Sequence, residues 1–281
     1  MNQLIELKHI NKKYGKKNIL YDISLSMNEN QVIAILGANG SGKSTFLRIA
    51  AGIERPDRGQ VVYPDKNIRI GYVPERFPKY LRFTPDEYLH YIGKISGISE
   101  TELKQRISSL LHRFQLDKWR GQRISGLSKG NIQKVGIIQA ILQQPDLLVL
   151  DEPLSGLDFP AQQELLLILG ELKRQGTTTL LTYHESSMFE EIVDQSYYIK
   201  DGYLTKENFL NKDAVKLIEV EGLTVIDVQE WEDVLDIATK ENNLLLYVGS
   251  ENTNQVLTRI LALQGSIEYV GNIEFKKNAE Q

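Results

Sequence analysis

The chain has 281 residues, a length that suits one large domain with an appendage or two domains. Hydrophobic residues make up 41% of it and charged residues 25%, and a net charge of −4 gives no reason to expect nucleic-acid binding through bulk electrostatics. Because the sequence contains no cysteine, disulfides and thiolate metal sites are excluded.

No stretch of the sequence has the pattern of a membrane-spanning helix. Residues 1–10 lack the hydrophobic stretch of a signal peptide. The longest purely apolar runs, such as Leu165–Leu169, are far shorter than the ~20 residues that a membrane helix needs. We therefore do not expect the chain to cross a membrane alone, which leaves docking on a membrane protein open.

The first half of the chain predicts short strands followed by helices. Strands are expected at residues 4–10, 19–27 and 32–36, and the last is a compact β-rich run typical of a buried strand. Helical patterns cover residues 44–51, most of 84–116, and 131–143. Pro85 stands at a favourable start position for the second of these, and Pro145 lies just beyond the third.

In the second half, strands and helices alternate. Strands are predicted at 147–150, 179–183 and 197–199, with helices at 161–174 and 186–193 between them. This alternation favours a parallel sheet with helices on its faces. A boundary is expected near residues 202–213. Beyond it, strands at 216–220, 244–248 and 267–269 and helices at 230–239 and 253–263 predict a small α+β domain without a recognisable catalytic constellation.

Residues Gly37 to Ser44 fit the phosphate-loop pattern G-x-x-x-x-G-K-[ST]. A predicted strand precedes the loop and a predicted helix follows it, as the motif requires. The glycines let backbone N–H groups turn inward around phosphate oxygens, and the helix adds free N–H donors. Lys43 can reach the β- and γ-phosphates, and Ser44 can ligate Mg²⁺. The alternatives are a glycine-rich turn without a ligand and a dinucleotide loop, whose spacing differs.

Asp151 and Glu152 end the apolar run at 147–150. Strand alternation points the two side chains differently, so Asp151 can hold the Mg²⁺ shell while Glu152 faces the water that attacks the γ-phosphate. Such a pair alone is more often a solvated strand end, but ligands of α/β proteins bind at the carboxyl ends of parallel strands. His184 follows the next predicted strand and is a candidate for facing the same phosphates. Position 188 is Met, so no zinc-helix motif follows it.

With these motifs in order, the sequence resembles the ATPase subunits of the ATP-binding cassette (ABC) family over roughly residues 3–205. Tyr14, in Lys-Tyr-Gly, matches the aromatic residue that stacks on adenine. The other matching segments are 71–75 (GYVPE) between the core and helical subdomains, the signature 127–131 (LSKGN, usually LSGGQ), 155–158 (SGLD) after the acidic pair, and the switch histidine His184.

The resemblance implies an α/β fold of the P-loop NTPase type. Residues 1–205 would form the ABC ATPase domain, with a mixed sheet core, an antiparallel β subdomain and a helical subdomain at about 76–145. Residues 206–281 would form a small C-terminal α+β accessory domain. The implied activity is ATP hydrolysis, with ATP and Mg²⁺ as cofactors. The implied site residues are Glu152, His184 and Lys43 for catalysis; Ser44, Glu75 and Asp151 for the metal; and Tyr14, Gly37, Asn39, Gly40, Ser41, Gly42, Lys43, Ser44, Thr45, Ser128, Gly130 and Asp158 for the nucleotide.

The resemblance also implies a head-to-tail dimer, of two copies of this chain or of this chain with a related subunit. Each ATP would lie between the phosphate loop of one protomer and the signature of the other. A hydroxyl at Ser128, a bare backbone at Gly130 and a positive helix end suit a γ-phosphate arriving from outside. The alternative is an ordinary helix that Ser128 caps.

Two positions depart from the family pattern. Position 75 is Glu where most members have Gln, and the signature has Lys129 in place of Gly and Asn131 in place of Gln. Both departures look like those of the branch that pairs with exporter-type membrane subunits. A carboxylate at position 75 can ligate Mg²⁺ but repels a triphosphate when the metal is absent.

These features favour an ATPase subunit that powers a membrane transporter of the exporter type, on the cytoplasmic face of the cell membrane. A separate membrane subunit would be its partner, docked near Phe77, Tyr80 and Phe83, and no nucleic-acid partner is expected. The alternative is a soluble ABC-type ATPase that acts on ribosomes or nucleic acid. A single cassette without a heptad insertion or a basic stretch disfavours it. The C-terminal domain would regulate, widen the dimer interface, or simply pack as an appendage.

Overall fold

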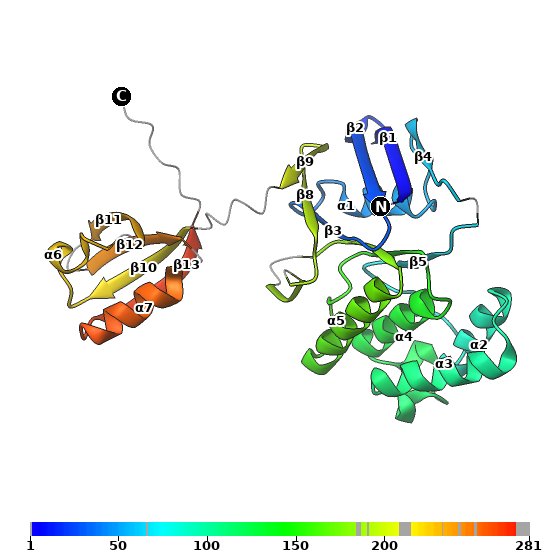
Figure 1. Ribbon diagram of the computed structural model, residues 1–281. Coiled ribbons are helices and arrows are strands. Elements are labelled where there is room, and N and C mark those ends of the chain that lie inside the picture. The colour runs from blue at the N-terminus through cyan, green and yellow to red at the C-terminus, as the bar shows by residue number, and fades with distance from the viewer. Residues whose placement is uncertain are drawn as a thin grey trace. The chain divides into compact units, whose positions relative to one another are not determined.

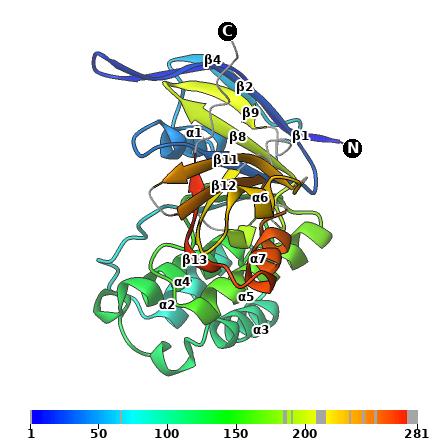
Figure 2. The same ribbon diagram turned by 90° about the vertical axis from the view of Figure 1, so that its left-hand side faces the viewer.

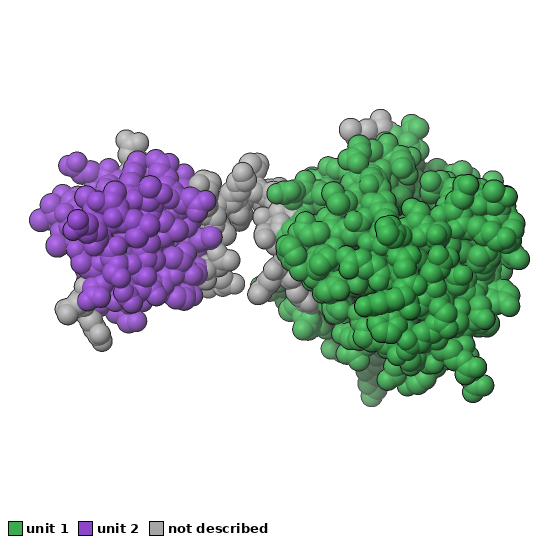
Figure 3. Space-filling view, turned by 90° about the horizontal axis from the view of Figure 1, so that it is seen from below, with its two compact units in different colours: residues 1–207 green, residues 208–281 purple. Residues whose placement is uncertain are grey.

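A computed structural model describes residues 2–65, 67–183, 187–189, 191–207, 215–231, 233–240, 243–249 and 252–273. The chain forms two compact units, residues 1–207 and residues 208–281, coloured green and purple in Figure 3. None of the helices in the described ranges is both long and apolar enough to span a membrane.

The centre of the first unit is a six-stranded sheet in the order β5-β6-β7-β3-β8-β9. Its first five strands pair in parallel and β9 pairs antiparallel with β8. The strands are β3 (Val32–Leu36), β5 (Ile70–Val73), β6 (Leu147–Leu150), β7 (Thr178–Leu181), β8 (Gln195–Lys200) and β9 (Tyr203–Glu207). All residues of β6 and β7 are buried, because a parallel sheet that is covered on both faces needs continuous apolar strands rather than alternating ones.

One face of this sheet carries α1 (Lys43–Ala50) and an antiparallel sheet of β1 (Gln3–Tyr14), β2 (Lys17–Asn28) and β4 (Arg58–Val62), in the order β2-β1-β4. The opposite face packs on helices (Figures 1 and 2). These are α2 (Pro85–Ile95), α3 (Glu100–Arg113), α4 (Lys129–Ile141) and α5 (Phe159–Arg174), with short 3₁₀ turns at Asp117–Trp119, Ile124–Gly126 and Ser187–Phe189.

The helical pattern predicted over 84–116 is two helices. Thr84 begins α2 with a capping box in which Glu87 reciprocates, and Pro85 takes the first helical position. The first helix ends before Gly97, whose φ of 77° suits glycine, and the Ser99 side chain accepts a hydrogen bond from the Glu102 N–H at the start of α3. The break therefore comes from a glycine stop followed directly by a serine cap.

The second unit has the element order βαββαβ of ferredoxin-like folds. Its antiparallel sheet has the order β11-β12-β10-β13. The elements are β10 (Val215–Glu221), α6 (Val225–Val228), β11 (Val234–Lys240), β12 (Asn243–Gly249), α7 (Thr253–Ala262) and β13 (Ser266–Ile273). Its own apolar core centres on Ile218, Leu246 and Ile260.

The helix predicted at 230–239 is wrong, because most of that stretch is strand β11. Val234 pairs with Val248 and Ile237 with Leu246 across the β11–β12 ladder. A short run with apolar residues three apart fits either element locally, and pairing with a neighbouring strand decides between them. The sheet order and the separate second unit agree with the expected α/β class, a mixed sheet with helices on its faces and a small C-terminal α+β unit.

Candidate nucleotide site

The phosphate loop lies between the carboxyl end of β3 and α1. Gly37, Gly40 and Gly42 all have positive φ angles, of 144°, 77° and 110°. A Cβ on Gly37 would stand 2.5 Å from the Ile199 carbonyl oxygen, and one on Gly42 would stand 2.8 Å from a Leu20 methyl carbon. Glycine is therefore required at both positions for space as well as for backbone conformation.

Lys43 is turned into this loop. Its Nζ donates to the carbonyl oxygens of Gly37, at 2.8 Å, and Ala38, at 3.2 Å, and the residue is 5% exposed. Burial lowers the pKa of Lys43, and the negative charges of Glu152, Asp151 and Glu75 oppose that effect. The loop thus holds a buried cation that is attracted by three carboxylates at the ends of β5 and β6.

Ser41 lies in the loop with its Oγ buried and without a hydrogen-bond partner in the described part of the chain. Thr179 Oγ1 and Ser196 Oγ, in strands β7 and β8 of the central sheet, are in the same state. The buried hydroxyl of Ser41 therefore does not by itself indicate a ligand.

The two carboxylates at the end of β6 have different surroundings, which the local backbone determines. Asp151 is 2% exposed and accepts a hydrogen bond from the Thr182 hydroxyl at 2.9 Å. The same hydroxyl accepts from the Glu152 N–H at 2.9 Å. Glu152 has φ of 50°, a left-handed conformation that is uncommon for a residue other than glycine. Thr182, which sequence reasoning missed, therefore fixes both members of the pair.

A pocket of about 510 Å³ brings many of the predicted residues together. It is lined by Lys17, Ile19, Asn39, Gly40, Gly42, Lys43, Ser44, Thr45, Glu75 and Glu152. Glu75 and Glu152 reach it from loops after β5 and β6, the neighbouring parallel strands. Lys17 and Ile19, at the start of β2, belong to no predicted motif. They reach the pocket because the β1–β2 hairpin packs against the start of α1, and no local sequence pattern predicts that packing.

The oxygen donors at this pocket suit Mg²⁺. Ser44 carries a hydroxyl and Glu75 a carboxylate at the pocket lining, the hard ligands that this ion prefers. Asp151 is buried next to Glu152 and does not itself line the pocket. No group of three or more His, Cys, Asp or Glu residues in the described ranges could hold a metal by itself. Mg²⁺ is usually bound through one or two carboxylates together with substrate phosphates. The donor set therefore fits a metal that enters with the nucleotide.

Tyr14 stands at the end of β1, directly across the strand pair from Lys17. Its side chain is 46% exposed, and it is not among the lining residues of the pocket. It lies beside the phosphate site through its strand partner Lys17, which does line the pocket. His184, the remaining predicted catalytic residue, lies outside the described residues.

Ser128 and Gly130 lie at the start of α4 and do not line the pocket either. The Ser128 side chain accepts a hydrogen bond from the Asn131 N–H at 3.3 Å. A Cβ on Gly130 would stand 2.4 Å from the Gly156 carbonyl oxygen, so the helix start packs directly on the loop after β6. The aliphatic part of Lys129 lies over Gly156. This is a packing role for the residue where the family has glycine.

Asp158 does not reach the pocket within its own chain. It caps α5, accepting from the Ala161 N–H at 3.3 Å, and forms an ion pair with Lys134 at 3.1 Å. The Lys134 side chain is 6% exposed and that of Asp158 60%, so the pair links α4 to the loop before α5 at the surface.

The aromatic residues predicted for partner docking differ in exposure. Phe77 packs against α4, where a Cβ on Gly136 would stand 2.5 Å from its ring. Tyr80 is 82% exposed and Phe83 43% exposed, and the Phe83 ring lies 5.3 Å from that of Tyr91. Of the aromatic residues in this stretch, Tyr80, Phe83 and Tyr91 are therefore exposed, and Phe77 packs against the helices.

Comparison with known proteins finds relatives of the first unit, which contains this pocket. A sequence profile described as ABC transporter matches residues 20–155. The uncharacterized ABC transporter ATP-binding protein MJ1023 of Methanocaldococcus jannaschii is 35% identical over 202 residues, which cover 72% of this chain and 76% of that protein. The linearmycin resistance ATP-binding protein LnrL of Bacillus subtilis is 27% identical over 278 residues, 92% of this chain and 89% of that protein. A solved ATP-binding subunit of an ABC transporter superposes with a TM-score of 0.69 at 30% identity and covers 74% of this chain and 91% of its own.

Proposed function

The chain belongs to the ATP-binding proteins of ABC transporters, and we propose that it hydrolyses ATP in a two-chain nucleotide sandwich that powers export. Its ATPase activity and its place as the ATP-binding subunit of a transporter follow from the family. The residue roles, the dimer, the metal and the direction of transport are the proposal. The observation that carries it is the single pocket that collects the phosphate loop, Glu75 and Glu152.

In this proposal Lys43 and the loop N–H groups bind the phosphates, and Ser44, Asp151 and Glu75 hold Mg²⁺. Mg²⁺ supplies charge neutralisation on the phosphate oxygens when it is bound. Glu152 takes a proton from the attacking water. Thr182 holds the backbone of Glu152 and the carboxylate of Asp151 in place through its hydroxyl. His184 is proposed to face the same phosphates.

The position of the signature supports the sandwich. Ser128, Gly130 and Asp158 do not line the pocket of their own chain. Ser128 and Gly130 nevertheless carry the exposed hydroxyl and the helix N-terminus that suit a phosphate. We assign Ser128 and Gly130 to the nucleotide of a second ATPase chain, either another copy of this one or a related subunit. Tyr14 is assigned to the adenine of its own chain's nucleotide.

Export is favoured by two features. LnrL, named for linearmycin resistance, aligns along nearly the whole chain, including the C-terminal unit. Glu75 and Lys129 are the departures that the exporter-type branch shares. The partner would be a separate membrane subunit, reached through the exposed surface of Tyr80, Phe83 and Tyr91, with this chain on the cytoplasmic face of the membrane.

Affinity purification of the tagged full-length chain from detergent-solubilised membranes tests the transporter role. We expect a multi-spanning membrane subunit to co-purify. A Tyr80→Ala, Tyr91→Ala double variant should lose that subunit and still bind ATP. A chain that elutes with ribosomes and never with a membrane subunit would instead support the soluble alternative.

Glu75→Gln tests the metal role of the carboxylate. We expect metal-free ATP to bind about tenfold more tightly to the variant, because one negative charge beside the triphosphate is removed, roughly 1.4 kcal/mol. Turnover at saturating Mg²⁺ should persist. The measurement is the ratio of ATP dissociation constants with EDTA and with Mg²⁺.

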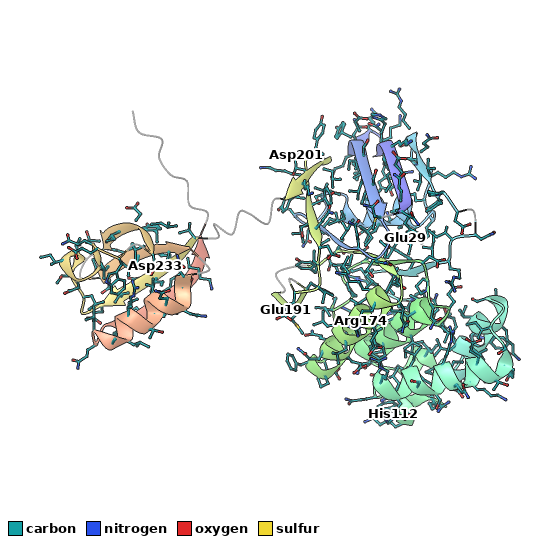
Figure 4. The ribbon with its side chains drawn as sticks, viewed as in Figure 1. Glu29, His112, Arg174, Glu191, Asp201 and Asp233 are labelled. Atoms are coloured by element: carbon teal, nitrogen blue, oxygen red, sulfur yellow. The ribbon has the colours of Figure 1, made fainter. Side chains whose placement is uncertain are left out.

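Glu29→Gln, an equal charge change at the opposite, amino-terminal edge of the parallel strands (labelled in Figure 4), is the control. An unchanged ratio in Glu75→Gln would reject the metal role.

A further inference from the structure

A cluster of four side chains joins the end of β1 to α1. The Tyr14 hydroxyl donates to Glu54 Oε1 at 2.6 Å and accepts from the Arg48 guanidinium at 3.1 Å. Arg48 also donates to Glu54 Oε2 at 3.0 Å, and the Lys12 ammonium lies 3.0 Å from Glu54 Oε1. The Glu54 carboxylate is thus the common partner of two cations and one phenol.

This cluster is well shielded and strongly bonded. The side chains of Lys12 and Glu54 are only 12% and 19% exposed. Burial raises the pKa of Glu54, but the hydrogen bonds from Tyr14, Lys12 and Arg48 outweigh it, and the net effect is a lowered pKa. Glu54 therefore remains ionised, and hydrogen bonds to an ionised acceptor are about twice as strong as neutral ones.

The cluster is connected to the nucleotide pocket at two points. Arg48 donates to the Thr45 hydroxyl at 3.3 Å, and Thr45 lines the pocket. Tyr14 pairs across β1 and β2 with Lys17, which also lines it. The Lys12 ammonium lies 5.6 Å from the centre of the Tyr14 ring, while 46% of Tyr14 stays exposed. The ring is thus held by its hydroxyl at the edge of the pocket with surface left for a ligand.

We propose that Glu54 and Arg48 are positioning residues that hold the Tyr14 ring ready to stack on the nucleotide base. The proposal rests on the base contact assigned to Tyr14 above. An aromatic side chain on an exposed strand end otherwise samples several rotamers, and ordering it on binding reduces affinity. The cluster removes that loss in advance, so it acts on ligands that carry a base and not on phosphates alone.

The test compares ADP with pyrophosphate, both with Mg²⁺, by calorimetry on the full-length chain. These ligands avoid hydrolysis and share the phosphate loop, but only ADP has a base. Tyr14→Phe keeps the ring and removes its tether. We expect it to raise the dissociation constant of ADP about three- to tenfold, the range of the net contribution of one ordinary hydrogen bond, and to leave that of pyrophosphate unchanged. Glu54→Gln should act in the same direction.

Tyr63→Phe is the matched control, because it removes a tyrosine hydroxyl that donates to the Ala50 carbonyl of α1 at 2.8 Å, away from the pocket lining. It should change neither constant. Tyr14→Ala, which removes the ring itself, distinguishes the base contact of Tyr14 from the positioning role of Glu54 and Arg48. If Tyr14→Ala weakens ADP but Tyr14→Phe does not, the base contact stands and the positioning role is wrong. If Tyr14→Ala also leaves ADP unaffected, the base contact itself is wrong. Parallel weakening of ADP and pyrophosphate would show that the cluster only supports the fold.

Discussion

Replacing Glu152 with glutamine is expected to lower the steady-state rate of ATP hydrolysis by two to three orders of magnitude, the usual size of a lost general base. Glutamine keeps the shape of the side chain but cannot take a proton from water. The left-handed backbone at position 152 and the hydrogen bond from its N–H to Thr182 do not depend on the carboxylate, so the site should keep its form. ADP should bind as it does to the parent chain.

Phosphate release at saturating ATP and Mg²⁺ measures this effect. Glu191→Gln, a neutralised glutamate that is exposed on the chain surface and labelled in Figure 4, should keep the parent rate. Hydrolysis by Glu152→Gln at the parent rate would show that another group accepts the proton.

The second large effect is expected at Gly130. A methyl group there would stand 2.4 Å from the Gly156 carbonyl oxygen, and both partners are backbone, so neither can simply turn away. Gly130→Ala should therefore displace the start of α4, at a cost of about 1–3 kcal/mol, and misplace the Ser128 hydroxyl. We expect turnover to fall at least tenfold while the affinity for ADP, which the phosphate loop alone holds, stays the same.

Gly121→Ala is the control for this change. No heavy atom lies within 4 Å of a Cβ at Gly121, and its φ is not in the left-handed range, so alanine fits there without a clash. Turnover and ADP binding should both stay at parent levels. If Gly130→Ala keeps full turnover, or loses ADP affinity and turnover together, the signature does not serve a separate nucleotide in the way proposed.

The sequence predicted the parts of the site that follow from local patterns. The phosphate loop and the acidic pair are contiguous motifs whose spacing fixes their geometry, and the pocket contains residues of both. Thr182, Lys17 and Ile19 could not be predicted in this way, since each reaches the site through strand pairing or packing over a long sequence distance. The network at Glu54 was missed for the same reason, because it joins residues of β1 to a loop 40 positions later.

Each error of secondary structure can be traced to particular residues. The break between α2 and α3 depends on Gly97 and the Ser99 cap within an otherwise continuous helical pattern. Strand β11 has too short an apolar pattern to distinguish a strand from a helix, and its pairing with β12 decides the outcome. The signature loop shows the limit most clearly, because one chain cannot reveal which molecule its Ser128 hydroxyl meets.

Light scattering on the full-length Glu152→Gln chain, with and without ATP and Mg²⁺, tests most directly whether ATP joins two copies of this chain. With the base removed, bound ATP should persist and hold the two protomers together. We predict the mass of two chains with ATP and of one chain without it, and a return to one chain when Gly130→Ala is added. A one-chain mass in the presence of stoichiometrically bound ATP would contradict a sandwich of two copies.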